Sequence, residues 1–325
     1  ILAARLASLA RGYSGVRFRL LQHIVLLLQH DALPLMPQEG SVGASGDLTP
    51  LSYLAAVLAG EREVLYNGER RTTASVFHLL QVEPLRFKPK EALAIMNGTA
   101  AMTGIACLAF VRAEYLSRLA TRITSLAVVA LQGNAYHFDE KLFAVKPHPG
   151  QIRVAARIRE DLQCHGETPR NDGRLQDRYS LRCAPHVIGV LEDALPWLRQ
   201  FIEIELNSAN DNPIIDAEGE HVLHGGHFYG GHIALAMDAL KTAVANLADL
   251  MDRQVHVVEA DDSLYDVHLW LAQSRLPAVP VVEHGRYRGV FTAERLWHVY
   301  DHVQERQFSW YRQGIRMLRR RLGQA

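Results

Sequence analysis

The stretch Gly40-Ser-Val-Gly-Ala-Ser-Gly-Asp-Leu-Thr-Pro50 runs into an apolar segment, residues 51–60, that is predicted to be helical. Six of its first seven residues are Gly, Ala or Ser, so the backbone can bend tightly there. One interpretation is a loop that leads into a helix, with Thr49 as N-cap and Pro50 at the first helical position. That interpretation leaves the lack of side-chain bulk in Ala44-Ser45-Gly46 unexplained.

A chemical interpretation does explain Ala44-Ser45-Gly46. Because Gly has no side chain, the Gly46 amide nitrogen can approach the Ala44 carbonyl carbon if the loop is tightly bent. Ring closure, with loss of water there and from Ser45, would leave an electron-poor ring that bears an exocyclic methylene. Such a ring is an electrophile, which none of the twenty side chains supplies.

The wider stretch Gly43-Ala-Ser-Gly-Asp-Leu-Thr-Pro-Leu51 resembles the signature of the aromatic amino-acid ammonia-lyases, and of the histidine ammonia-lyases in particular. This resemblance implies that Ala44, Ser45 and Gly46 cyclise into the prosthetic group 4-methylidene-imidazol-5-one (MIO). Five further motifs match the family in the right order: RGYSGV at 11–16, MNGT at 96–99, LQDRYSLRC at 175–183, ELNSANDNP at 205–213 and GGHFY at 225–229. The resemblance covers roughly residues 1–254.

The matched motifs imply roles for particular residues. Besides the MIO triad, the resemblance implies that Asn97 and Tyr179 are catalytic, and that the substrate is bound by Gln176, Arg182, Phe228 and Asn212.

Each of these roles has a physical reason. Arg182 can bind a substrate carboxylate in a bidentate fork that Lys could not reproduce. Tyr179 lies three residues earlier, so both side chains should project from one helical face. Asn97 lies where Gly98 interrupts a buried helical region, which frees amide groups to bond a polar ring.

Ordinary structural roles compete with these assignments. Arg182 could form a surface salt bridge, and Gln176 and Asn212 could serve in turns or caps. A buried Phe such as Phe228 is more often part of a core.

Three histidines, His224, His227 and His232, are close enough in sequence to raise the question of a metal site. No carboxylate or Cys ligand set accompanies them, so no metal is expected.

The composition is that of an ordinary soluble globular protein, with 48% hydrophobic and 22% charged residues in a chain of 325. Lys plus Arg and Asp plus Glu both number 35, so no net charge favours nucleic acid or a membrane. Cys107, Cys164 and Cys183 form no CxxC pair, which favours a reducing, cytoplasmic compartment. The N-terminus is not a signal peptide, and we expect no apolar run long enough to span a bilayer.

The hydrophobic period predicts a mainly α protein built on long bundled helices over residues 1–254. The family resemblance implies that this bundle is of the ammonia-lyase type, which is similar to that of the fumarases and aspartases. The longest helices are expected over residues 101–131, 179–209 and 232–254. From residue 255 the pattern changes to β-α-β-β-α with a basic C-terminal helix, and 255–325 is expected to be a separate α/β segment.

The stretch at residues 276–294 resembles one cystathionine-β-synthase-type (CBS) repeat. Such repeats hold adenine nucleotides through a G-x-x-T-x-x-D pattern. Here Gly289 and Thr292 match it, but Arg295 replaces the Asp, so a packing or pairing role is favoured over nucleotide binding.

The chain also departs from the family pattern. The resemblance implies that the tyrosine base and the segment that selects the substrate side chain lie ahead of residue 1, and that the C-terminal helices are replaced after Gln254. The chain is therefore expected to be truncated at both ends. His227 stands where Asn is more usual. Family active sites draw residues from three subunits of a homotetramer.

The leading hypothesis is an MIO-dependent lyase that converts histidine to urocanate, or a related aromatic amino acid to its unsaturated acid. The second is an aminomutase, which returns ammonia to the β-carbon. The third is an inactive helical scaffold joined to a nucleotide-sensing CBS-like segment.

Overall fold

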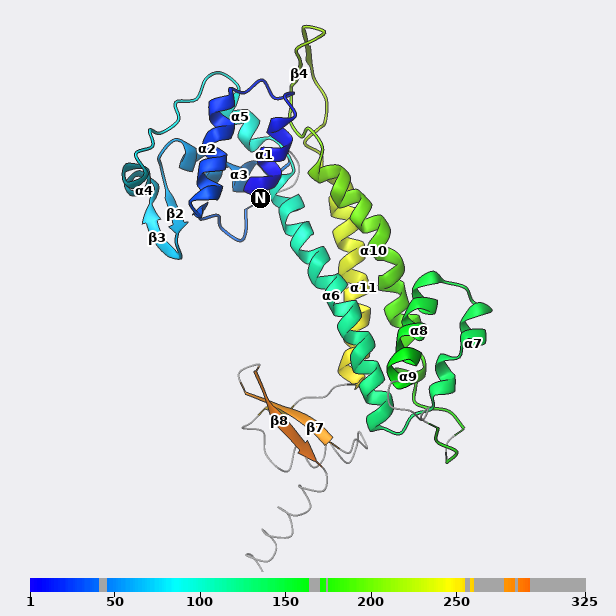
Figure 1. Ribbon diagram of the computed structural model, residues 1–325. Helices are drawn as coiled ribbons and strands as arrows, with labels where there is room; N and C mark the ends of the chain where they lie inside the picture. The colour runs from blue at the N-terminus through cyan, green and yellow to red at the C-terminus, as the bar shows by residue number, and fades with distance from the viewer. Residues whose placement is uncertain are drawn as a thin grey trace, which may run out of the picture. The chain divides into compact units, whose positions relative to one another are not determined.

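The computed structural model describes residues 1–40, 46–163, 170–173 and 175–254, together with the strands at 258–259, 278–283 and 286–292 (Figure 1). The chain divides into two compact units, Ile1–Leu116 with Leu191–Val244 and Ser117–Val190 with Ala245–Ala325. Each unit is described by itself below.

The N-terminal part of the first unit is a small helical core with a three-stranded sheet. Its elements are α1 (Leu2–Ala10), α2 (Phe18–Gln29), β1 (Ala32–Pro34), α3 (Leu48–Leu58), β2 (Glu63–Tyr66), β3 (Glu69–Thr72), α4 (Thr73–Leu80) and α5 (Glu91–Met96). The sheet is antiparallel in the order β1-β2-β3. Leu20, Ile24, Leu54 and Leu58 are fully buried in one cluster that joins these helices. Burial of such apolar side chains is the main stabilising contribution to this part of the fold.

Two turns follow local sequence signals. Asn67 and Gly68 have φ values of +51° and +83°, the left-handed backbone that Asn-Gly hairpins adopt, and they connect β2 to β3. The helical region is interrupted at residues 97–99, as predicted: α5 ends at Met96 and α6 (Ala100–Ala130) begins after Thr99.

Long helices follow: α6, α10 (Ala184–Leu206) and α11 (Gly231–Gln254) run beside one another in Figure 1. The single helix predicted over 179–209 was wrong, because Cys183 separates a short helix at Tyr179–Arg182 from α10, and α10 ends at Leu206, where the Asn207 side chain donates to the Glu203 carbonyl. Within the first unit, Arg199 of α10 pairs with Glu114 of α6 at 3.1 Å, and Phe201 of α10 meets the His232 ring of α11 edge-on. The hairpin of β4 (Ile214–Asp216) and β5 (His221–Leu223) connects α10 to α11.

The second unit contains the short helices η1 (Ala135–Phe138), α7 (Glu140–Ala144), α8 (Pro149–Gln163) and α9 (Tyr179–Arg182). Ser125 of α6 donates a 2.8 Å hydrogen bond to Asp161 of α8. Gln254, at the end of α11, donates to the Ser180 carbonyl at 2.7 Å and so holds α9.

Three strands are described after Gln254. β6 (Val258–Glu259) pairs parallel to β7 (Ala278–Glu283), and β7 pairs antiparallel to β8 (Arg286–Thr292). This is the predicted strand order, but the two predicted helices and Arg295 lie outside the described residues. The CBS-like identity, its nucleotide site and the boundary at 254 stay predictions.

The start of α3 corrects the cap prediction. The helix begins at Leu48 with Asp47 as the N-cap residue, so Thr49 lies in the first turn and Pro50 at the third helical position. The Asp47 side chain makes no cap hydrogen bond. It accepts instead from the Met102 amide, so a tertiary contact overrides the local capping pattern.

The prediction that no apolar run could span a bilayer was wrong on length and composition. Among the described residues, the stretch Glu91–Ala130 is long and apolar enough, although 56% of its most apolar window is buried in the protein. The buried core helices of soluble proteins pass the same test.

The buried carboxylate of Glu91 ties the start of α2 to the start of α5. It accepts from the Arg17 side chain at 2.6 and 2.8 Å, from the Arg17 amide at 3.1 Å and from the Lys88 amide at 2.7 Å. These hydrogen bonds, led by the one from the Arg17 side chain, lower the pKa of Glu91 from 4.5 to about 2.

Replacing Glu91 by Gln should lower the free energy of unfolding by about 2 kcal/mol at pH 7, because hydrogen bonds from a cation to a buried anion are lost. The folded-state pKa is depressed, so this stabilisation is full above pH 4.5 and declines as the pH falls toward 2. Urea titrations at several pH values measure the difference in unfolding free energy between the unmutated chain and Glu91→Gln. Exposed Glu63, paired with Arg70, is the control, and Glu63→Gln should change stability less. If the loss of unfolding free energy in Glu91→Gln does not vary with pH, the lowered pKa of Glu91 is contradicted.

Candidate active site

Gly46, the last residue of the proposed cyclising triad, lies in a cradle of main-chain oxygens. Its φ is +76°, and a Cβ placed on it would lie 2.5 Å from the Gly98 carbonyl oxygen and 2.9 Å from that of Phe228. No other residue type fits both this backbone and this space. Ala44 and Ser45 lie outside the described residues.

Asp47 fixes the end of the same loop. Its amide donates to the Gly98 carbonyl at 2.7 Å, and its carboxylate accepts from the Met102 amide at 2.8 Å. The end of the loop is thereby tied to the break between α5 and α6 and to the first turn of α6. Sequence reasoning assigned Asp47 no role; the available signal was an acidic residue directly after a bare triad.

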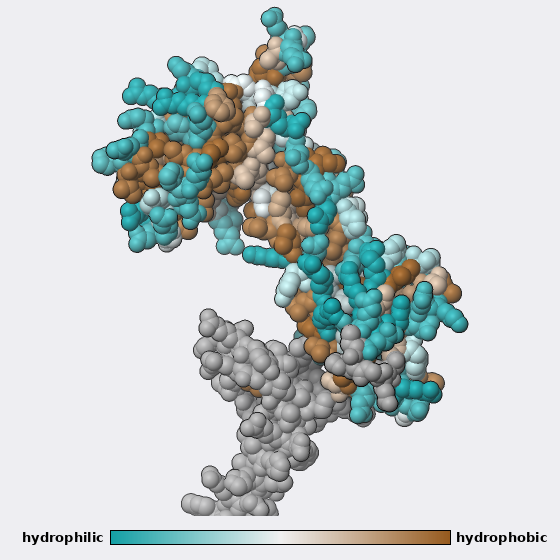
Figure 2. Space-filling model, in the orientation of Figure 1, coloured by the Kyte–Doolittle hydropathy of each residue, from teal (hydrophilic) through white to brown (hydrophobic). Residues whose placement is uncertain are grey.

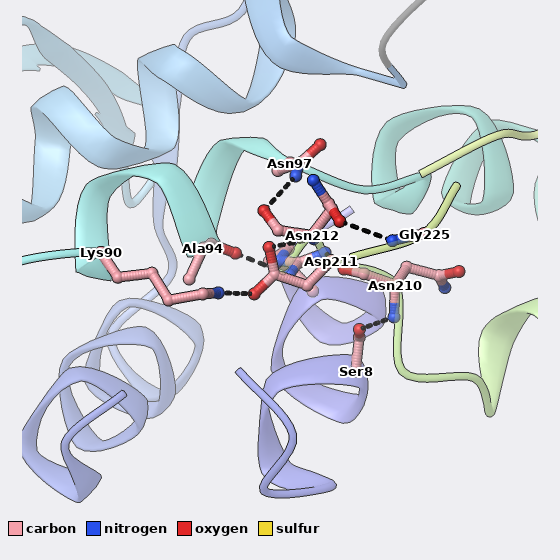
Figure 3. Close-up of polar contacts among 9 residues, drawn as sticks. Ser8, Lys90, Ala94, Asn97, Asn210, Asp211, Asn212 and Gly225 are labelled. Carbon is pink, nitrogen blue, oxygen red and sulfur yellow. Dashed lines mark hydrogen bonds and ion pairs between the residues drawn. The ribbon is translucent and has the colours of Figure 1, made fainter. Parts of the chain in front are cut away.

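Asn97 and Asn212, which are 115 positions apart, lie in contact (Figure 3). Asn97 is 6% exposed and its Nδ2 donates to the Asn212 carbonyl at 2.9 Å. The Asn212 Oδ1 accepts from the Gly225 amide at 2.9 Å. Gly46, Asn97, Asn212 and Phe228 therefore belong to one neighbourhood, joined through the Gly98 backbone.

A buried ion pair and a buried guanidinium support this neighbourhood, and sequence reasoning missed both. Lys90 Nζ lies 2.5 Å from the fully buried Asp211 carboxylate (Figure 3). Arg5, 0% exposed, donates to the Asn210 carbonyl at 2.8 Å and to the Ala94 carbonyl at 2.6 Å. Burial lowers the pKa of Arg5 to about 10, and the charge of Asp211 opposes the shift. A single charged residue among the apolar positions of α1 was the signal for Arg5.

The Arg5 guanidinium also determines which residue can occupy position 98. A Cβ on Gly98 would overlap Arg5 Nη1 and would lie 2.8 Å from the Asn210 carbonyl oxygen. Gly98 is thus held between Arg5 on one side and the Gly46–Asp47 backbone on the other.

The remaining predicted residues lie in the second unit. The guanidinium carbon of Arg182 lies 5.6 Å from the centre of the Tyr179 ring, which confirms that the two side chains share one helical face. Arg182 Nε is buried without a hydrogen-bond partner among the described residues. Gln176 is exposed, in the loop that leads into α9.

The histidine spacing does not coincide with a metal centre in the part of the chain that is described, where no group of three or more His, Cys, Asp or Glu residues could hold an ion. His232 packs its ring against Phe201 instead.

Comparison with known proteins decides the family. The profile described as aromatic amino acid lyase matches residues 1–272. The chain belongs to this family. The matched stretch extends past Gln254, where we expected the family resemblance to end.

Family relatives catalyse more than one reaction. Over 256 residues the chain is 43% identical to a histidine ammonia-lyase of Shouchella clausii, covering 78% of this chain and 51% of that one. A tyrosine aminomutase from Streptomyces globisporus superposes with a TM-score of 0.70 at 38% identity, covering 78% and 51%. A histidine ammonia-lyase from Trypanosoma cruzi superposes with a TM-score of 0.71 at 34% identity, covering 78% and 47%. The chain thus spans about half the length of the curated relatives it matches.

The cradle predicts that Gly46→Ala is much worse than an equivalent change elsewhere. Gly68 is a matched control, because its φ is +83° and a Cβ there meets nothing within 4 Å. Both variants should lose about 1 kcal/mol for the left-handed backbone, and Gly46→Ala about 2 kcal/mol more for the overlap with two carbonyls. Chemical denaturation measures both. Equal losses would show that the cradle is absent.

Arg5→Met keeps the length of the side chain but removes its donors, so the buried Ala94 and Asn210 carbonyls lose their partner and Asp211 loses one of the two cations near it. We expect a loss of about 3 kcal/mol in unfolding free energy. Arg11→Met, at an exposed position on the neighbouring turn, should stay within about 0.5 kcal/mol of the parent. Urea titration measures the unfolding free energy of both variants. If Arg5→Met loses no more than Arg11→Met, the Arg5 guanidinium does not stabilise the backbone around Gly98.

Proposed function

We propose that the chain carries the core of an ammonia-lyase that converts L-histidine to urocanate. The observation that carries this proposal is the position of Gly46, the last residue of Ala44-Ser45-Gly46. Its left-handed backbone and the two nearby carbonyl oxygens leave room for glycine and for no larger residue. Identity of 43% to a histidine ammonia-lyase, over the stretch that contains LQDRYSLRC, supports histidine as the substrate.

The described residues fit the prosthetic group MIO. Gly46 presents no Cβ, and the carbonyl oxygens of Gly98 and Phe228 lie so close that only Gly can supply the cyclising amide nitrogen at this position. Asp47, which follows the triad directly, and Asn97, which precedes Gly98, would hold the ring. Once formed from Ala44, Ser45 and Gly46, MIO would supply an electrophile for the substrate amine.

Residues of both units would bind and orient the substrate, each substrate site being shared among subunits of the assembled protein, as the family resemblance implies. Arg182 would grip the carboxylate through its guanidinium, which Tyr179 already contacts. Gln176 and Asn212 would add amide donors, Asn97 would orient the amine, and Phe228 would place an apolar side chain beside the ring. Tyr179 and Asn97 would be the two catalytic residues outside the MIO triad.

The overall reaction breaks one C–H bond at the β-carbon and the C–N bond at the α-carbon. A carbon–carbon double bond forms, and the proton and ammonia leave the substrate. Neither the proton nor the amine leaves easily in water, so the geometry around both atoms must be preorganised.

We further propose that the parent protein is a homotetramer in the cytoplasm. Along the first half of α6, apolar side chains stay exposed in this single chain: Ile105, Leu108, Val111 and Tyr115 are 59–63% exposed. Figure 2 shows brown, hydrophobic surface over this part of the molecule. A row of this kind favours burial against another chain. Cys107 and Cys183 are free thiols, in keeping with a reducing compartment.

An aminomutase is the second candidate, because a tyrosine aminomutase superposes on 78% of the chain. It would use the same electrophile but return ammonia to the β-carbon. Product analysis separates the two: urocanate indicates the lyase, and a β-amino acid indicates the mutase.

Ser45→Ala tests the proposal, because Ser45 would supply the methylene of the electrophile. The unmutated chain should show the ultraviolet absorbance of the MIO chromophore, and the full-length protein that contains it should form urocanate from L-histidine. Ser45→Ala should lose the absorbance in the chain and the urocanate formation in the full-length protein. Ser52→Ala is the control, since Ser52 only donates to the Thr49 carbonyl within α3. A parent chain with the same ultraviolet spectrum as Ser45→Ala would contradict the proposal.

A further inference from the structure

The loop that carries Gln176 is held by a buried polar group on the segment before α7. The Asp177 amide donates to His137 Nε2 at 3.0 Å, and the Asp177 carboxylate accepts from the Asn134 amide at 2.5 Å. Tyr136 donates through its hydroxyl to the Leu175 carbonyl at 2.9 Å. Gln176 therefore sits between two residues whose backbone groups are both anchored.

A second anchor lies at the start of the described part of the loop. The Asn171 amide donates to Asn134 Oδ1 at 2.6 Å, and Asn171 Nδ2 donates to the Gln132 carbonyl at 3.1 Å. Asn134 is fully buried and Asp177 is 3% exposed, so water does not compete readily for these bonds.

The contact between His137 and Asp177 requires a particular protonation state. A backbone N–H can only donate, so His137 Nε2 must be the acceptor and the ring must be neutral with its proton on Nδ1. A proton on Nε2 would face the Asp177 N–H. The Asp177 carboxylate, 3.6 Å from Nε2, would then be the alternative partner, and the backbone contact would be given up.

The surroundings of His137 favour the neutral ring. Burial lowers its pKa below 6.5, the Arg182 charge lowers it further, and the Asp177 charge acts in the opposite direction. Of the elements packed against it, α8 contributes Arg159, which donates to the Phe138 carbonyl. At the start of α7, Asp139 accepts from the Lys141 amide, and the Tyr136 ring packs on the imidazole at 4.5 Å.

We propose that neutral His137 is a positioning residue that latches the Gln176 loop, and that its protonation opens the latch. The loop leads directly into α9, which presents Tyr179 and Arg182. That this placement serves a substrate carboxylate rests on the proposed function, whereas the latch itself does not.

Hydrogen exchange followed by mass spectrometry on the full chain tests the latch without substrate. Exchange of the peptide covering 170–182 is compared between pH 5 and pH 8 after correction for intrinsic rates. In the parent chain, protection should be high above pH 6.5 and fall about tenfold below it, as one buried hydrogen bond is lost.

Three variants separate the latch from a general loss of stability. His137→Gln keeps an acceptor at the place of Nε2 but does not titrate, so protection should persist at both ends of the pH range. His137→Leu should lose protection throughout. His186→Gln is the matched control: this ring also packs in the second unit, against Phe143, and burial lowers its pKa too. It should behave as the parent does.

The proposal would be overturned if the hydrogen-exchange protection of the 170–182 peptide in the unmutated chain did not change with pH. It would also be overturned if this peptide were as protected in His137→Leu as in the unmutated chain. A chain that lacks the MIO chromophore but shows the pH-dependent latch would refute the proposed function and leave the latch in place.

Discussion

The buried guanidinium of Arg5 is the contact on which the first unit's site depends. It joins α1 to the last turn of α5 and to the Asn210 loop, segments that lie 89 and 205 positions away. A buried cation is destabilising unless it is paired and fully bonded. The Ala94 and Asn210 carbonyls accept the hydrogen bonds of the guanidinium, and Asp211 supplies the opposite charge nearby. Asp211 is itself paired with Lys90.

This polar framework explains why the neighbouring backbone is irregular. The helix breaks between Met96 and Ala100, and Gly98 lies against the guanidinium where a side chain could not fit. Its carbonyl is thereby directed at Gly46 and Asp47. The strain and desolvation of this region are offset by the apolar core of α1 to α5, and the chain gains a rigid place in which a loop of small residues can bend tightly.

Local sequence signals predicted the elements well and the framework poorly. The Asn67-Gly68 hairpin, the break at Asn97 and the shared face of Tyr179 and Arg182 each follow from short-range geometry. The lone charge in α1 marks Arg5 as unusual, but the roles of Arg5 and Asp211 could not be predicted that way, because their partners lie far along the chain and only the fold brings them together. The prediction of Thr49 as N-cap was wrong for a similar reason. The helix begins earlier, at Leu48, after Asp47 has been fixed by the Met102 amide, and the local pattern does not contain that contact.

The central claim is that this framework turns Ala44-Ser45-Gly46 into an electrophile, and peptide mass spectrometry tests it most directly. A digest of the purified chain should yield the peptide spanning residues 44–46 lighter than its encoded mass by two molecules of water. The encoded, unmodified mass for that peptide in the folded chain would contradict the account.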